Sequence, residues 1–260
     1  MADVDLRNVP RLGLALGGGG VLGAAHVGVL QVLHERGIHP VMVAGTSAGA
    51  VMGAAYATGR DPYDLEELAL SATWGDFGRL KPVPGLGLLD SEQLRHTIER
   101  IGGQDHLIEE LPMPYAAVAT DARTGEAVVI TSGSLIEAMR ASIAVPGLFR
   151  PARRGRQLML DGGLVQNLPL ATVFEMGAEH VIGVRLAPEW DALPGSRTAV
   201  QVHELEIDRR VTLITPRLAG RSEWVAKDLP GLIELGREAA EHVLAAYPVV
   251  TPPHRPPDLH

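Results

Sequence analysis

The stretch VAGTSAGAVMG, residues 43–53, contains the spacing G-x-S-x-G at Gly45, Ser47 and Gly49. This spacing is typical of a nucleophile elbow, in which a serine is held at a sharp turn between a strand and a helix. The flanking glycines let the backbone and a substrate approach the serine closely. A serine hydroxyl is a poor nucleophile until a base removes its proton. The remainder of the chain must therefore supply that base.

The residues around the elbow predict a repeated strand–helix pattern. Two short apolar runs, RLGLAL (11–16) and PVMVAG (40–45), are typical of buried parallel strands. Residues 23–36 place apolar side chains on one helical face and stop at Gly37, and residues 47–58 predict a second helix. The order β–α–β–α implies parallel strands joined by a right-handed crossover.

Further elements are expected along the rest of the chain, together with a long loop rich in glycine and proline over 72–90. The expected helices begin after Asp61-Pro62, after Asp90, at the capping-box pair Ser134 and Glu137, and at residue 230. The expected strands lie within 114–131, where there are two, and within 156–163, 180–187 and 211–215. We expect a single α/β domain over 9–247 and a disordered tail over 248–260.

The composition predicts a soluble globular protein. Of 260 residues, 46% are hydrophobic, and no apolar run reaches the roughly 20 residues needed to span a bilayer. The N-terminal MADVDLRNVP has acidic residues where a signal peptide would carry positive charge and then an apolar stretch. The absence of cysteine excludes disulfides and thiolate chemistry, and the net charge of −8 argues against nucleic acid as a partner. We expect a cytoplasmic protein, with peripheral contact at a membrane left open.

A second glycine-rich turn, GGGGVLG (17–23), ends the first expected strand. Its G-x-G-x-x-G spacing is compatible with a dinucleotide phosphate bound at a helix N-terminus. That interpretation requires an acidic residue near the end of the second strand, where this chain has VAGT (43–46). The same amides are suited to stabilise the oxyanion of an acyl intermediate formed on Ser47 at the same sheet edge. We favour the oxyanion interpretation over the nucleotide site and over glycines that serve only tight turns.

Histidine and aspartate are the two candidate types for the base. The histidines lie at helix, strand or tail positions where structural or solvated roles are expected: His26, His34, His180, His242, His254 and His260. Asp161 ends an expected strand and is followed by Gly162 and Gly163, which leave its carboxylate uncovered. An aspartate before glycines is also a common turn former, so the residues alone leave both interpretations open.

The chain as a whole resembles the patatin-like phospholipase family, in particular its compact bacterial members. The resemblance covers most of residues 11–187 and rests on three motifs in order: GGGGVLG (17–23), GTSAG (45–49) and DGG (161–163). The linking segments ATDARTGE (119–126), ASIAVPGLFRP (141–151) and DGGLVQNLP (161–169) also look like the family. This ordered combination is more specific than any one of the motifs.

The resemblance implies a serine–aspartate dyad without histidine. Ser47 would attack an ester carbonyl, and Asp161 would act as the general base on its hydroxyl. The amides of Gly18, Gly19 and Gly20 would receive the oxyanion. The turns would be supported by the motif glycines Gly23, Gly45, Gly49, Gly162 and Gly163. The family fold is a three-layer α/β/α sandwich with a largely parallel central sheet, and the dyad requires no metal and no cofactor.

The chain departs from the family pattern at two places. Leu22 stands where the family loop usually carries arginine or lysine, so help from a nearby cation is lost although the backbone amides remain. The segment between the strands near 181–186 and 211–215 also looks shorter than usual. We expect a lipid acyl hydrolase acting on phospholipid or lysophospholipid esters. The alternatives are a short-chain carboxylesterase on the same dyad and a catalytically weak regulatory protein that keeps the fold.

Two segments are candidates for lipid contact. Apolar side chains of the 72–90 loop are suited to line an acyl groove or touch a membrane, although packing on the core is the simpler interpretation: Trp74, Phe77, Val83, Leu86, Leu88 and Leu89. An arginine cluster is suited to hold a phosphate head group, although a solvated hairpin is the simpler interpretation: Arg150, Arg153, Arg154 and Arg156.

Overall fold

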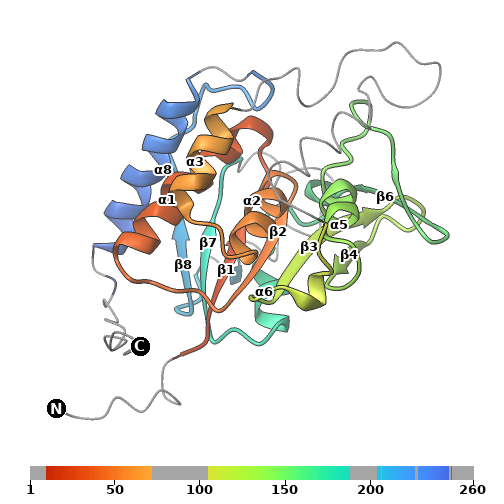
Figure 1. Cartoon of the computed structure of the whole chain (residues 1–260), viewed down its shortest axis with the longest axis horizontal. Helices are drawn as coiled ribbons and strands as arrows, with labels where there is room; N and C mark the ends of the chain where they lie inside the picture. Colours follow the sequence, from red (N-terminus) through yellow and green to blue (C-terminus); the bar gives the residue numbers. More distant parts are fainter. Residues whose placement is uncertain are drawn as a thin grey trace, which may run out of the picture.

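A computed structural model of the chain contains a mixed β-sheet with helices packed on both faces (Figure 1). The structure describes residues 10–71, 105–187, 204–205, 207–225, 228–245 and 247. Within these segments eight strands form one sheet, in the order β5-β6-β3-β2-β1-β7-β8, with β4 paired to β3. Among the described residues, no helix is long and apolar enough to cross a membrane.

The centre of the sheet is parallel and one side of it is antiparallel. The parallel strands are β3 (Tyr115–Asp121), β2 (Met42–Thr46), β1 (Leu12–Leu16), β7 (His180–Val184) and β8 (Val211–Ile214). The antiparallel strands are β4 (Ala127–Ile130) and β6 (Gln157–Asp161), both paired to β3, and β5 (Ala152–Arg154), paired to β6. The carboxyl ends of the parallel strands meet at one edge, which is where sites form in such sheets.

Helices cover the two faces of the sheet unequally. The larger layer contains α1 (Ala24–Glu35), α2 (Ala48–Ala57), α3 (Pro62–Ser71), α5 (Leu135–Ser142) and α8 (Leu229–Leu244). Among the described residues, the other face is covered by α6 (Leu170–Glu175), and Leu205 also packs on its apolar cluster. Alternate strand residues point to opposite faces, so Leu14 and Val43 join the larger apolar cluster while Ala15 and Ala44 join the smaller one. The three layers are those expected from the sequence.

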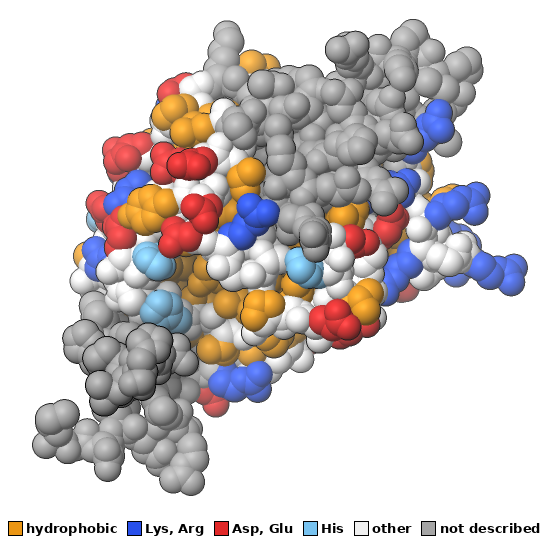
Figure 2. Space-filling view, viewed as in Figure 1, with side chains coloured by type: hydrophobic (Ala, Val, Ile, Leu, Met, Phe, Trp, Pro, Cys, Tyr) orange, Lys and Arg blue, Asp and Glu red, His pale blue; other side chains and the backbone are white. Residues whose placement is uncertain are grey.

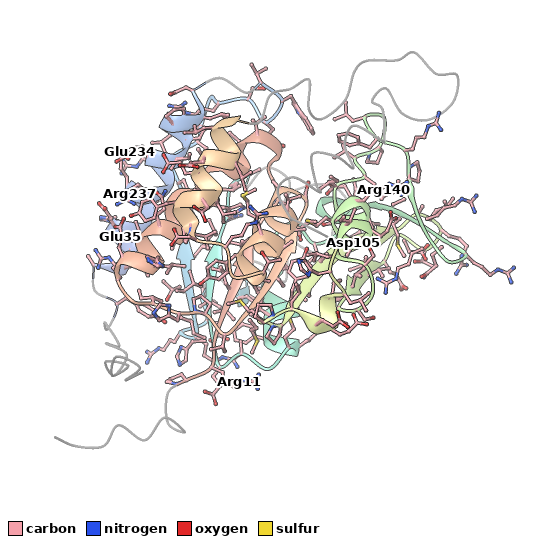
Figure 3. All side chains as sticks on the ribbon, viewed as in Figure 1. Arg11, Glu35, Asp105, Arg140, Glu234 and Arg237 are labelled. Carbon is pink, nitrogen blue, oxygen red and sulfur yellow. The ribbon has the colours of Figure 1, made fainter. Side chains whose placement is uncertain are left out.

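Helix α8 closes the larger layer by packing along α1, and α3 lies beside them (Figure 1). Arg237 of α8 forms an ion pair with Glu35 at the end of α1, with 2.8 Å between Nη1 and Oε1 (Figure 3). The same guanidinium donates to Gln31 Oε1 at 3.2 Å. The C-terminal helix is thereby attached to the first β–α unit, which carries the glycine-rich loop.

Most of the expected elements are confirmed. The Ser134 hydroxyl accepts the Glu137 amide at the start of α5, as the capping-box spacing predicts, and Asp61 accepts the Tyr63 amide at the start of α3. Strand β5 and helix α6 were not predicted, because three and six residues are too short to show a periodicity. The 72–90 loop, the helix after Asp90 and the 248–260 tail lie outside the described residues.

Candidate active site

Ser47 occupies the turn between β2 and α2, with φ 53° and ψ −120°. A positive φ is rare for a residue with a side chain, and it is maintained only where the surrounding structure requires it. The two motif glycines make the turn sterically possible. A Cβ on Gly45 would lie 2.2 Å from the Gly49 carbonyl oxygen, and one on Gly49 would lie 2.0 Å from the Leu16 oxygen. This geometry is that of the elbow expected from G-x-S-x-G.

Strand pairing brings Asp161 to Ser47. Strand β2 runs parallel to β3 and ends with Thr46 opposite Val118. Strand β6 runs antiparallel to β3 and ends with Asp161 opposite Ala119, the next residue. The two strand ends therefore approach each other head-on. Across this junction the Ser47 hydroxyl donates to Asp161 Oδ2 at 2.8 Å, within the range for general base catalysis.

The carboxylate of Asp161 is held from several sides. The carboxylate oxygen Oδ1 accepts the Gly163 amide at 2.7 Å. The backbone carbonyl of Asp161 accepts the Thr120 hydroxyl, also at 2.7 Å. Gly162 is required for a close approach, because a Cβ there would lie 2.2 Å from the Val118 oxygen. The DGG motif thus leaves one carboxylate oxygen for the nucleophile while a backbone amide fixes the other.

Burial raises the pKa of Asp161 to about 6. The side chain is nearly excluded from solvent, with 2% of its surface exposed, and an apolar surrounding disfavours the charged form. Hydrogen bonds from Gly163 and Ser47 act in the opposite direction, and the negative charge of Glu223 adds to the rise. A carboxyl with this pKa is mostly ionised at neutral pH and accepts a proton more readily than an ordinary aspartate.

The glycine-rich loop lies directly beside the nucleophile. A Cβ on Gly18 would be 3.2 Å from the Ser47 Cβ, and one on Gly23 would be 2.7 Å from the Ala48 Cβ, so both glycines permit the close packing. Gly20 has a φ of 55°, and a Cβ there would lie 2.5 Å from the Glu223 carbonyl oxygen. The loop and the elbow thus meet at the carboxyl ends of β1 and β2.

The amides of this loop differ in their hydrogen-bond partners. Gly18, expected among the oxyanion donors, donates its N–H to the Asn167 carbonyl at 3.1 Å. The amides of Gly19 and Gly20 have no hydrogen-bond partner within the described segments. In this arrangement the Gly18 amide is occupied by a carbonyl, whereas the amides of Gly19 and Gly20 are available to a ligand.

His26 and Leu22 have structural roles behind the loop. His26 is fully buried in α1, and its Nε2 lies 2.8 Å from the Gly17 carbonyl oxygen, which accepts the hydrogen bond. Burial lowers the pKa of His26 to about 4, so the imidazole is neutral at pH 7. Leu22 is 3% exposed and belongs to the larger apolar cluster. Within the described segments, no histidine forms a hydrogen bond with Ser47 or Asp161.

Two residues that contact the site were not assigned a role from the sequence. Ser142, the last residue of α5, accepts the Ser47 amide, and Asn167 accepts the Gly18 amide through its carbonyl. Both lie in segments that resemble the family, ASIAVPGLFRP and DGGLVQNLP. Resemblance marks such segments, but only the tertiary structure shows which atoms they contact.

The two candidate lipid-contact segments have different outcomes. All four arginines of the cluster are exposed: Arg150, and on the β5–β6 hairpin Arg153, Arg154 and Arg156. Arg154 donates to the Ser132 carbonyl at 3.1 Å. Figure 2 shows basic side chains projecting at the end of the molecule that carries this hairpin. The apolar residues of the 72–90 loop, from Trp74 to Leu89, lie outside the described residues.

Comparison with known proteins gives the class of this chain. The family model for patatin-like phospholipases matches residues 14–174, which include the glycine-rich loop, the elbow and the DGG motif. This match covers more than half of the chain. The chain therefore belongs to the patatin-like phospholipase family.

Relatives and solved structures agree with this assignment. An NTE family protein of Mycobacterium tuberculosis is 41% identical over 195 residues, which cover 71% of this chain and 53% of that protein. Neuropathy target esterase sws of Drosophila melanogaster is 34% identical over 189 residues, covering 69% of this chain and 13% of that protein. The chain thus spans about half the length of the mycobacterial relative it matches.

Two solved structures share the fold at low sequence identity. VipD from Legionella pneumophila aligns with a TM-score of 0.63 and 16% identity, covering 91% of this chain and 67% of that one. The ExoU–SpcU complex from Pseudomonas aeruginosa contains a chain that aligns with a TM-score of 0.54 and 16% identity, covering 91% and 52%. At this level of identity, the likeness shows the fold alone.

Proposed function

We propose that this protein hydrolyses acyl esters of lipids, with Ser47 as the nucleophile and Asp161 as the general base. The observation that carries the proposal is the 2.8 Å hydrogen bond from the Ser47 hydroxyl to Asp161 Oδ2 at a strained elbow. A serine needs an adjacent base, and the base here is a carboxylate whose pKa is raised towards neutrality. Membership of the patatin-like phospholipase family supports the same chemistry.

The reaction follows from these contacts in two halves. As the Ser47 oxygen bonds to the ester carbonyl carbon, its proton passes to Asp161, and the amides of Gly19 and Gly20 receive the oxyanion. Collapse of the intermediate breaks the ester bond, and Asp161 returns the proton to the departing alcohol. Asp161 then takes a proton from water as the water oxygen attacks the acyl-serine carbonyl. When this second intermediate breaks the bond to Ser47, Asp161 returns the proton to the Ser47 oxygen and the fatty acid is released.

The proposed substrate class is supported by the names of the relatives and not by the dyad, which would cleave any accessible ester. Related proteins carry the names neuropathy target esterase and patatin-like phospholipase domain-containing protein 6. We extend this to phospholipid or lysophospholipid esters for the present chain, with peripheral contact at the lipid surface as part of the proposal. A short-chain carboxylesterase would use the same residues and differ in its acyl preference.

A fluorophosphonate probe and an ester series test this proposal. The probe should label the wild type and an exposed-serine control, Ser132→Ala, and should not label Ser47→Ala. Asp161→Asn should lose turnover, while His242→Ala should keep it. Release of fatty acid from lysophosphatidylcholine micelles and from p-nitrophenyl esters of increasing length should favour long acyl chains. A preference for acetate would favour the short-chain esterase, and absence of labelling in the wild type would overturn the enzymatic proposal.

A further inference from the structure

The C-terminal end of α5 contacts the backbone of both members of the dyad. Ser142, the last residue of the helix, is fully buried, and its Oγ accepts the Ser47 amide at 2.8 Å. Two residues further, the Ala144 carbonyl accepts the Asp161 amide at 3.0 Å. One short segment outside the three catalytic motifs is therefore bonded to both the nucleophile and the base.

The hydrogen bonds at Ser142 make its hydroxyl oxygen an acceptor for the Ser47 amide. A serine hydroxyl has a single proton and two acceptor sites. Here the proton is donated to the Val118 carbonyl of β3 at 2.6 Å, so the oxygen faces the Ser47 amide as an acceptor. Because its proton is committed to a buried carbonyl, Ser142 is not itself a second nucleophile. The hydroxyl joins the strand that supports the dyad to the turn that carries Ser47.

The Ser47 amide needs an acceptor from outside its own helix. Amides at a helix N-terminus have no intrahelical partner, and no side chain caps α2. The Ser47 carbonyl, in contrast, accepts the Ala50 and Val51 amides and is held by the helix itself. Ser142 therefore supplies the bond that fixes the N-terminal side of the strained residue.

Helix α5 is held firmly enough to act as a spacer. At its N-terminus the Ser134 hydroxyl donates to Asp105 at 2.8 Å, and Asp105 Oδ1 accepts the Ile136 amide at 3.2 Å (Figure 3). Along its length Leu135 and Met139 are fully buried. Anchored at one end, the helix presents its other end to the dyad at a fixed position.

We propose that Ser142 is a positioning residue, which holds the Ser47 amide so that the α5 end sets the spacing between nucleophile and base. The inference rests on the proposed function, because it assigns Ser142 an effect on the chemistry of Ser47. It also gives a role to the segment ASIAVPGLFRP (141–151), which the catalytic motifs leave unexplained.

Three variants test the positioning role. Ser142→Ala removes the acceptor and should slow fluorophosphonate labelling of Ser47 and lower kcat by roughly 10- to 100-fold, with KM changed less than about two-fold. Ser142→Thr retains the hydroxyl and should recover most of the loss. Tyr115→Phe is the matched control. The buried Tyr115 hydroxyl donates to the Ala50 carbonyl in α2, the helix that follows Ser47, and makes no hydrogen bond to Ser47 itself.

The outcomes separate positioning from general stability. Each variant is assayed well below its own melting temperature, so that the folded fraction is the same. Wild-type labelling rates in Ser142→Ala, or an equal slowing in Tyr115→Phe, would overturn the positioning role. If Ser142→Ala does not fold, Ser142→Cys is measured instead, because its thiol fills the space and is a weaker acceptor. An unlabelled wild type would instead reject the proposed function.

Discussion

Ser47 and Asp228 are the non-glycine residues with positive φ in the described parts of the chain, at 53° and 56°. Each stands immediately before a helix, Ser47 before α2 and Asp228 before α8. Their ψ angles differ, at −120° for Ser47 and 50° for Asp228. The aspartate therefore lies in the left-handed helical region, which short polar side chains adopt at modest cost, and the serine does not.

The two side chains are also used differently. The Asp228 carboxylate accepts the Gly231 amide at 3.1 Å and so caps its own helix. The Ser47 hydroxyl makes no bond to α2 and donates to Asp161 instead. At the start of α8 the unusual backbone serves the helix. At the start of α2 it turns the side chain away from the helix and towards the base, which is the pattern of a strained functional residue.

The largest expected effect separates the two positions by activity. Ser47→Gly should lower the rate of ester hydrolysis by about 10³-fold or more. Relief of the backbone strain should raise its free energy of unfolding by about 1 kcal/mol. Asp228→Gly should keep activity within about two-fold, because a glycine N-cap costs only tenths of a kcal/mol. Ester hydrolysis and urea unfolding measure the two quantities. Retained hydrolysis in Ser47→Gly would remove the functional explanation of the strain.

The next effect concerns the pH dependence of the serine site. Asp161 must be ionised to accept a proton and has a pKa of about 6, so kcat/KM should fall about tenfold per pH unit below pH 6. Glu223→Gln should move this fall in kcat/KM to lower pH, because the charge of Glu223 raises the pKa of Asp161. Rates are compared from pH 4.5 to 8. A flat profile across this range would exclude Asp161 as the titrating base.

A smaller effect should appear in stability at the same residue. The folded pKa of about 6 lies above the ordinary value of 3.8, so ionisation of Asp161 opposes folding at neutral pH, and this cost disappears as pH falls from 6 to below 4. Asp161→Asn should therefore raise the free energy of unfolding by about 3 kcal/mol at pH 7.5, and by much less at pH 4. Thermal melts at both pH values measure the gain. A gain independent of pH would contradict the assigned cause.

The smallest effect belongs to the capping position. Asp228→Ala removes the bond to Gly231 and should lower the free energy of unfolding by about 1 kcal/mol, with activity retained. Asp228→Asn keeps a capping oxygen and tolerates the same backbone, so its loss should be smaller. Urea unfolding of the two variants provides the comparison. Equal losses would show that the ion pair with Arg221, rather than the cap, is what stabilises this turn.

Neighbouring residues alone predict the elbow, whereas the pairing of Ser47 with Asp161, 114 residues away, is predicted only through the resemblance to a family. The elbow depends on Gly45, Ser47 and Gly49, and their spacing alone indicates the turn. Ser142 and the Ser47 amide are 95 residues apart, and the bond between them depends on how α5 packs against β3. The same holds for the Asn167 carbonyl, which accepts the amide of Gly18, one of the expected oxyanion donors. Spacing reveals local turns, whereas these partners arise from tertiary packing.

The head-on meeting of β2 and β6 makes the dyad depend on the register in which β6 pairs with β3. Thr46 and Asp161 pair with successive residues of β3, so the register of β6 on β3 determines whether the base lies beside the nucleophile. A slip of β6 by one residue would move Asp161 by about 3.3 Å and turn its side chain to the opposite face. The pairing of β6 with β3 therefore brings Asp161 to Ser47 in one register only.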